Sequence, residues 1–285
     1  MPLNFKPMKT ARTLLWLALE LGLNGCEGIE RSVVEIANVP TSNLPFVTSF
    51  ISPQDSVLRV KIEQTVPVVG QLPANTFAGS PVTGATVSIT NGLQSVTLPY
   101  NERRFEYQTK PRSFTVIAGG TYQLTIRLKD GATISSSCTI PSEAVPLQSI
   151  RIIRDPNTPK VRFTWPDLPG PTNFYATSFY LFRLFSDGTV DTTGDRLEEV
   201  FSAESDSKGG RFITKLVDPV SFSNERNALI ISRTDKLYYE YHRALSALVL
   251  AKDNPFADPI RLPSNMQGAY GVFCGYTRTT ASLRL

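Results

Sequence analysis

The stretch "TYQLTIRLKDGATISSSCTI", residues 121–140, decides the fold class of this chain. Two runs of alternating polar and apolar residues, rich in β-branched side chains, flank the dipeptide Asp130-Gly131. Asp-Gly is a preferred pair for the tight turns that join antiparallel strands, and a two-residue period is that of a half-buried strand. The segment therefore predicts a β-hairpin and an all-β fold around it.

The same pattern recurs upstream of this hairpin. "SVLRVKIEQ", residues 56–64, alternates apolar with charged side chains, and "ATVSIT" ends at Asn91-Gly92, another pair typical of hairpin turns. "QSVTLPY" and "RRFEYQT" follow as further short strands. About seven short strands in roughly a hundred residues are typical of an immunoglobulin-like β-sandwich. We expect this first domain over residues 44–142.

Two prolines in "PSEAVP", residues 141–146, predict a boundary, and residues 147–285 form a second, mainly-β domain in this interpretation. Within it "FYATSFYLFRLF", residues 174–185, is β-prone in composition but long enough for a helix, so both remain open. "DKLYYEYHRALSALVLAK", residues 235–252, predicts one helix with Asp235 as its N-cap. The sequence thus predicts two β-sandwich domains, the second with a packed C-terminal helix.

The N-terminal part of the chain has the organisation of an export signal. Lys6, Lys9 and Arg12 precede "LLWLALELGLNGCEG", residues 14–28, and no acidic residue lies among them. The run Leu14–Leu23, apolar apart from Glu20, is too short to cross a bilayer as a helix. A basic flank followed by such a run is typical of a signal peptide.

The apolar run ends at a small residue followed by a cysteine, Gly25-Cys26. "LNGC" looks like a lipobox, in which signal peptidase cuts before the cysteine and the cysteine is acylated. We therefore expect a lipoprotein signal peptide over residues 1–25, a lipidated Cys26 as the first mature residue, and a polar tether over residues 26–43. The alternative is an ordinary N-terminal helix or strand with a buried Cys26.

The charge balance argues against a nucleic-acid-binding protein. The chain carries 29 Lys and Arg against 25 Asp and Glu, a net charge of +4 at pH 7. The expected signal peptide contains three basic residues and one acidic residue, so the mature chain keeps about +2. No Lys/Arg-rich patch follows, and a phosphate-binding surface needs one. We expect no nucleic-acid partner.

Several segments resemble one family in their order along the chain. They are the lipobox, "SFISPQDSVLRVKIEQTVPVVG", "SPVTGATVSITNG", "GGTYQLTIRLKDG", "YYEYHRAL" and the closing "NPFADPIRLPSNMQGAYGVFCGY". The chain resembles the Bacteroidota lipoprotein family known as domain-of-unknown-function family 4249, from about Cys26 to Tyr276. It departs from the family at Ala269 and Cys274, where glycines are expected.

The resemblance implies a place in the cell envelope. Such proteins are often encoded beside TonB-dependent outer-membrane transporters, so it implies an accessory or ligand-binding role in uptake, with an outer-membrane barrel as partner. It implies no catalytic residues and no cofactor. Glu27 and Glu30 resemble the acidic stretch of surface-exported lipoproteins, which favours the cell surface over the periplasmic face. A structural or adhesive envelope protein is the alternative.

The residues themselves offer no catalytic or metal site. His242 is the only histidine, it lies in the predicted helix, and no G-x-S-x-G motif accompanies it. A zinc site needs about four His or Cys ligands, which the sequence does not supply together. Asp187, Asp191 and Asp195 could hold calcium, but their spacing is not that of a calcium loop and favours turns. We predict that the protein is not an enzyme.

Aromatic residues and cysteines leave two further alternatives open. Aromatic side chains cluster in the segment 174–185 and at Tyr238, Tyr239 and Tyr241. They could form a platform that binds carbohydrate or peptide, or they could fill the core. With Cys26 lipidated, Cys138 and Cys274 remain as a pair. They could form a disulfide between the two domains or stay buried as single thiols, which the sequence favours. The sequence does not identify a ligand-binding residue.

Overall fold

The computed structural model describes residues 44–65, 79–110, 114–170, 172–184, 190–217, 225–251, 258 and 260–283. All of them lie in one compact unit, Asn43–Leu285. The expected signal peptide, Cys26 and the tether lie outside the described residues. The unit is mostly β-structure with one long helix, which confirms the predicted fold class.

The N-terminal strands follow the sequence pattern closely. They are β1 (Phe46–Ile51), β2 (Leu58–Glu63), β3 (Thr86–Thr90), β4 (Ser95–Leu98), β5 (Tyr100–Asn101), β6 (Glu106–Thr109), β7 (Thr121–Arg127) and β8 (Thr133–Thr139). β7 and β8 pair as the hairpin predicted at Asp130-Gly131. β3 and β4 likewise flank Asn91-Gly92, and Gly92 has φ +87°, a conformation that favours glycine.

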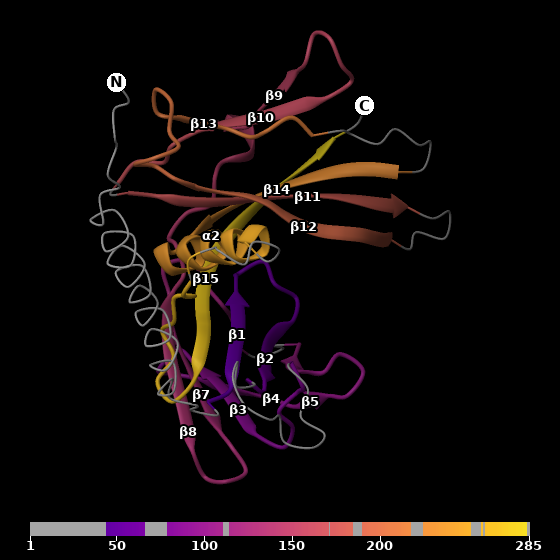
Figure 1. Cartoon of the computed structure of the whole chain (residues 1–285). Helices are drawn as coiled ribbons and strands as arrows, with labels where there is room; N and C mark the ends of the chain where they lie inside the picture. The colour runs from indigo at the N-terminus through magenta and orange to yellow at the C-terminus, as the bar shows by residue number, and fades with distance from the viewer. Residues whose placement is uncertain are drawn as a thin grey trace, which may run out of the picture. The chain divides into compact units, whose positions relative to one another are not determined.

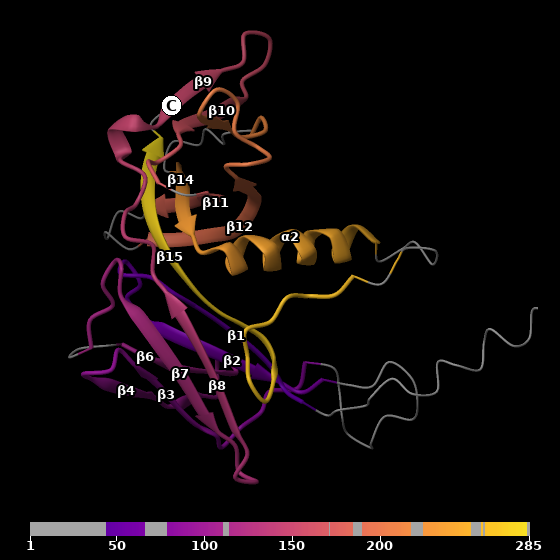
Figure 2. The same ribbon diagram turned by 90° about the vertical axis from the view of Figure 1, so that its left-hand side faces the viewer.

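Two sheets pack face to face in this part of the chain (Figures 1 and 2). One contains β4, β3, β7 and β8, and the other contains β1, β2, β6 and β5. Alternate residues of both sheets point into one core; Val60, Ile89, Leu124 and Ile134 are all fully buried there. This is the β-sandwich that alternation predicts, because every second side chain of each strand reaches the space between the sheets.

The C-terminal part adds longer strands around a second core. They are β9 (Arg151–Arg154), β10 (Val161–Pro166), β11 (Phe174–Leu184), β12 (Val190–Ser202), β13 (Arg211–Ile213), β14 (Glu225–Thr234) and β15 (Tyr270–Leu283), with a short 3-10 helix η3 (Leu147–Ser149) before β9. The aromatic segment 174–185 is therefore a strand over its described residues. In the second core, Trp165 stacks on Phe212 with ring centroids 5.4 Å apart, and the ring centroid of Tyr175 lies 4.7 Å from that of Phe212.

One strand joins the two parts. β15 pairs in parallel with β1 through Tyr270–Gly275 and then antiparallel with β14 through Tyr276–Leu283. A single eight-stranded sheet results, in the order β12-β11-β14-β15-β1-β2-β6-β5, beside the three-stranded sheet β13-β10-β9 (Figure 1). The closing strand, expected in the second domain alone, thus belongs to both, and it bridges the boundary predicted at residues 141–146.

Gly271 allows β15 to approach β1. Its φ is +112°, and a Cβ atom at this position would overlap the backbone of Val47, the residue that it faces in the register. Glycine alone combines this conformation with so close an approach of two strands. The glycine at position 271 is therefore what permits the parallel pairing between the first and the last strand of the described sheet.

The helix α2 (Lys236–Ala251) lies where the sequence predicts it and packs against β15 and β1 (Figure 2). Tyr241 joins Val272 and Cys274 in a small third cluster, and Phe50 packs against its edge. In the part of the chain that the structure describes, no helix has the length and apolarity needed to cross a membrane.

Candidate functional site

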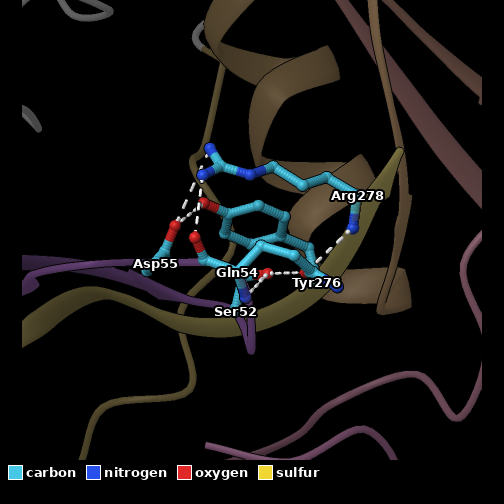
Figure 3. A network of polar contacts seen from close by, with 5 residues as sticks. All are labelled: Ser52, Gln54, Asp55, Tyr276 and Arg278. Carbon is cyan, nitrogen blue, oxygen red and sulfur yellow. Dashed lines mark hydrogen bonds and ion pairs between the residues drawn. The ribbon is translucent and has the colours of Figure 1, made fainter. Parts of the chain in front are cut away.

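A polar network lies where the turn after β1 meets β15 (Figure 3). In the turn, Ser52 donates to Gln54 Oε1 at 2.6 Å, and the Asp55 amide donates to the Ser52 carbonyl at 3.1 Å. These bonds fold "SPQD" into a compact turn that presents the Asp55 carboxylate and the Gln54 amide oxygen to the neighbouring strand.

β15 supplies the other half of the network. Tyr276 donates to Asp55 Oδ1 at 2.9 Å, and Arg278 Nη1 lies 3.8 Å from the same oxygen. The backbone amide of Arg278 donates to Gln54 Oε1 at 3.3 Å, and its Nη2 donates to the Gln54 carbonyl at 2.9 Å. Two residues of one strand thus hold the turn through four contacts, three from side chains and one from the backbone amide of Arg278.

Burial controls the titration of this network. It raises the pKa of Asp55 above its usual range, although the Tyr276 hydroxyl and Arg278 act in the opposite direction. Burial raises the pKa of Tyr276 as well, and the neighbouring Asp55 carboxylate adds to that rise. Both partners of Asp55 Oδ1 are side chains of β15, so the contacts join the turn to this strand. We assign a structural role to this network: it joins two of the segments that carry the family resemblance.

Asp235 forms a second polar junction, at the start of α2. Its Oδ1 accepts a hydrogen bond of 2.7 Å from the Tyr238 amide, which confirms the predicted N-cap. Its Oδ2 accepts one of 2.8 Å from the Gly275 amide on β15. Burial raises the pKa of Asp235 while both amides oppose the rise. One carboxylate therefore caps the helix and fixes it to the central strand.

The cysteine pair lies close to Asp235. The structure has Cys138 and Cys274 as buried free thiols, so the disulfide considered from the sequence is not formed in it. Burial raises the pKa of both thiols, and the charge of Asp235 raises it further. A thiol must ionise to act as a nucleophile, so neither cysteine is poised for such chemistry.

His242 is packed among aromatic rings on α2. Its ring centroid lies 4.2 Å from that of Tyr238, 5.1 Å from Phe50 and 5.2 Å from Tyr241. Nδ1 lies 2.9 Å from the Tyr238 carbonyl, which can only accept, so Nδ1 carries the hydrogen. Burial lowers the pKa of His242. The ring is half-buried and partnered, as expected for a helix residue that contributes to packing.

A surface cavity of about 440 Å³ opens between the start of α2 and the ends of β11 and β12. Its lining combines rings, charges and hydroxyls: Thr172, Phe174, Ser202, Glu204, Ser205, Lys236, Tyr239, Glu240 and Arg243. This volume is within the range of small-molecule sites, which lie in concave places with a few directed polar groups. We take it as the candidate ligand-binding site.

Two aromatic rings are in contact in the lining of this cavity. Phe174 and Tyr239 lie with ring centroids 5.2 Å apart, and Arg243 donates to the Tyr239 hydroxyl at 3.0 Å. Lys236 pairs with Glu240 at 3.3 Å, and both residues belong to the lining. An apolar ring surface framed by hydrogen-bonding groups can bind a polar ligand that has one apolar face.

The predicted aromatic platform is thus divided. Phe174 and Tyr239 line the cavity, whereas Tyr175 is fully buried in the second core and Phe179 packs against it. The side chains of residues 180–198, which include Asp187, Asp191 and Asp195, lie outside the description. Among the described side chains, no group of three or more His, Cys, Asp or Glu could hold a metal ion.

Sequence reasoning missed the cavity and the network at Asp55. The only signal for the network is that Asp55 and Tyr276 lie in segments that carry the resemblance, around residues 49–70 and 254–276. The cavity gives no local signal, because Thr172 and Glu204, which share a 3.0 Å hydrogen bond there, are 32 positions apart, one before β11 and the other after β12.

The chain is similar to a family of unknown function and, distantly, to solved structures. The domain of unknown function DUF4249 matches residues 34–282. No curated protein matches the chain. Among the solved structures, 18 chains match. One is a mutant of Salmonella alpha-2-macroglobulin, with 10% sequence identity and a TM-score of 0.23; the match covers 67% of this chain and 13% of that one. Because the family match spans most of its length, this protein belongs to the DUF4249 family.

Proposed function

We propose that this protein is a non-catalytic lipoprotein of the outer membrane that serves as an accessory or ligand-binding partner of a TonB-dependent uptake system. The observation that carries the proposal is the order of features before Cys26: a basic flank, a short apolar run and Gly25. Membership of the DUF4249 family supports it, because the resemblance implies Bacteroidota lipoproteins encoded beside such transporters.

The lipid makes such a partnership effective. An acylated Cys26 would confine the protein to the membrane plane, which raises its effective concentration near a barrel without any new contact. Residues 26–43 would then act as the tether between the lipid and the folded unit that begins at Asn43. Glu27 and Glu30 favour the surface side of the membrane.

Binding rather than turnover is supported by how the reactive groups are used. His242 is packed between rings with its Nδ1 hydrogen on a backbone carbonyl. Asp55 and Asp235 are committed to internal donors, and the thiols of Cys138 and Cys274 resist ionisation. The cavity instead offers the half-buried ring of Phe174 and the exposed polar side chains of Lys236 and Arg243. We assign ligand capture to it, with a saccharide as the class that this chemistry suits best.

A structural or adhesive envelope protein is the second candidate. The observation that favours it is the eight-stranded sheet, in which β15 joins both cores through backbone hydrogen bonds. Such a continuous sheet would act as a rigid spacer between the membrane and a neighbour. In that case the cavity carries no ligand, and loss of the protein leaves uptake unchanged.

Gentle detergent extraction of the tagged native protein tests the proposal. We expect an intact mass that begins at an acylated Cys26 and a TonB-dependent barrel that co-purifies. Arg243→Ala should weaken uptake of the transported substrate, while the matched surface variant Arg104→Ala should not. An unmodified Cys26 with residues 1–25 still attached contradicts the anchor. Absence of a barrel, together with unchanged uptake in a deletion strain, favours the structural alternative.

A further inference from the structure

β9 is an exposed edge strand. In the described part of the chain it pairs with β10 alone, and all four of its residues, Arg151–Arg154, are exposed. It is an outer strand of the sheet β13-β10-β9, and Figure 2 shows it at the end of the unit opposite β3 and β4. An edge strand with open backbone groups can accept a further strand from another chain.

The hydrogen bonds that β10 makes along its other edge show which backbone groups of β9 are open. The Phe163 amide donates to the Thr214 hydroxyl at 3.0 Å, and the Phe163 carbonyl accepts from the Thr214 amide at 3.0 Å. Val161 exchanges two backbone hydrogen bonds with Val217, of 3.0 and 2.8 Å. The backbone groups of Phe163 and Val161 therefore point away from β9.

Their partners on β9 must then face the open edge. Phe163 pairs with Ile152, and Val161 pairs with Arg154, both in positions that exchange no ladder hydrogen bond. By the alternation of an antiparallel pair, the amides and carbonyls of Ile152 and Arg154 point outward, while those of Ile153 bond to β10. β9 thus presents two donors and two acceptors in register to an incoming strand.

The side chains of β9 specify what that strand contains. Ile152 is 47% exposed and Ile153 is 43% exposed, one on each face of the sheet. Arg151 and Arg154 flank them, and in the described structure neither is joined to an acidic side chain by an ion pair. A complementary strand has apolar residues opposite the two isoleucines and carboxylates opposite the two arginines. A second copy of β9 would place arginine against arginine.

We propose that β9 binds an extended acidic segment of a partner protein as an added strand, with the pattern acidic-apolar-apolar-acidic. Backbone hydrogen bonds to Ile152 and Arg154 give the strand its register, and the flanking arginines select its charge. The inference rests on the edge of the three-stranded sheet and is independent of the cavity and of the lipid anchor.

The test uses the full chain in mild detergent and a synthetic peptide with a Glu-Val-Val-Glu core. Single-residue hydrogen exchange should show the amides of Ile152 and Arg154 exchanging fast in the free protein and at least tenfold more slowly with the peptide. The amide of Ile153, already bonded to β10, should change little. A peptide with a Lys-Val-Val-Lys core should bind at least tenfold more weakly.

Two peptides N-methylated at alternate residues separate strand pairing from charge attraction. Only one set of alternate amides faces β9, so one methylated peptide should lose binding and the other should keep it. The double variant Arg151→Glu, Arg154→Glu should reverse the preference toward the Lys-Val-Val-Lys peptide. Equal binding of both methylated peptides, or unchanged exchange at Ile152 and Arg154 under saturating peptide, overturns the proposal.

Discussion

Tyr276 donates a hydrogen bond of 2.9 Å to Asp55, although 221 positions separate the two residues. Asp55 lies in the turn that follows β1. Tyr276 lies at the point where β15 stops pairing with β1 and starts pairing with β14. The bond therefore stabilises the junction at which one strand passes from the first core to the second, and it ties the start of the described chain to its end.

Tyr276→Phe removes this bond and leaves the enclosed Asp55 carboxylate without its nearest donor. We expect the free energy of unfolding to fall by about 1–3 kcal/mol, the cost of an unsatisfied buried acceptor. Urea denaturation at pH 7 measures the loss. Tyr100→Phe is the control. The ring of Tyr100 packs against that of Tyr107, as the ring of Tyr276 packs against that of Tyr238, but no described group bonds to the Tyr100 hydroxyl. Equal stability of the two variants would contradict the assignment.

The only histidine gives the protein a defined pH response. Burial lowers the pKa of His242 in the folded state below its ordinary value of 6.5. The unfolded chain then binds more protons than the folded one below that pH, so stability is present above pH 6.5 and is lost as pH falls through the folded pKa. His242→Gln should flatten this part of the stability profile.

Denaturation of both proteins between pH 7.5 and about pH 5 supplies the comparison, because subtracting the variant's profile removes the contribution of the carboxyl groups. A proton NMR titration of the His242 ring gives the folded pKa directly, since the chain has one histidine. A measured pKa at or above 6.5 would show that burial does not control this ring.

Local sequence patterns predicted the local structure of this chain. The hairpins at Asn91-Gly92 and Asp130-Gly131 form as expected, because turn chemistry and a two-residue period act over a few residues. Asp235 caps α2 for the same reason: a carboxylate reaches the amides of the next turn. Such elements are determined by neighbours in sequence.

The long-range arrangement was not readable in the same way. Nothing near Gly271 indicates that it faces Val47, and prolines at 141 and 146 suggested a boundary that β15 bridges. The cavity residues Phe174 and Tyr239 come from different elements, and their neighbour Tyr175 lies in the core on the same strand. Which aromatic residues reach the surface depends on packing across the sheet, which no single segment specifies.

Gly271→Ala tests the close approach of β15 to β1. A Cβ atom at 271 would overlap the backbone of Val47 in addition to the strain of φ +112°. Gly131→Ala is the matched control, because Gly131 has φ +90° but open space around its Cβ position. The control should lose about 1–2 kcal/mol from backbone strain alone. Gly271→Ala should lose clearly more, with faster amide exchange in β1; equal losses would mean that strand contact is not limiting.

Asp235 links helix and sheet, and two substitutions separate its bonds. Asp235→Asn keeps an oxygen for the Tyr238 amide but sets an NH₂ group against the Gly275 amide, so we expect a loss of about 1–3 kcal/mol for the unsatisfied buried donor. Asp235→Ala also removes the cap and should lower the free energy of unfolding by about 0.5–2 kcal/mol more. Urea unfolding measures both losses, and hydrogen exchange of the Gly275 amide should accelerate in both variants. If Gly275 stays protected in Asp235→Ala while the helix frays, the carboxylate acts as a cap alone and the link to β15 is made by packing of α2 against Val272 and Cys274.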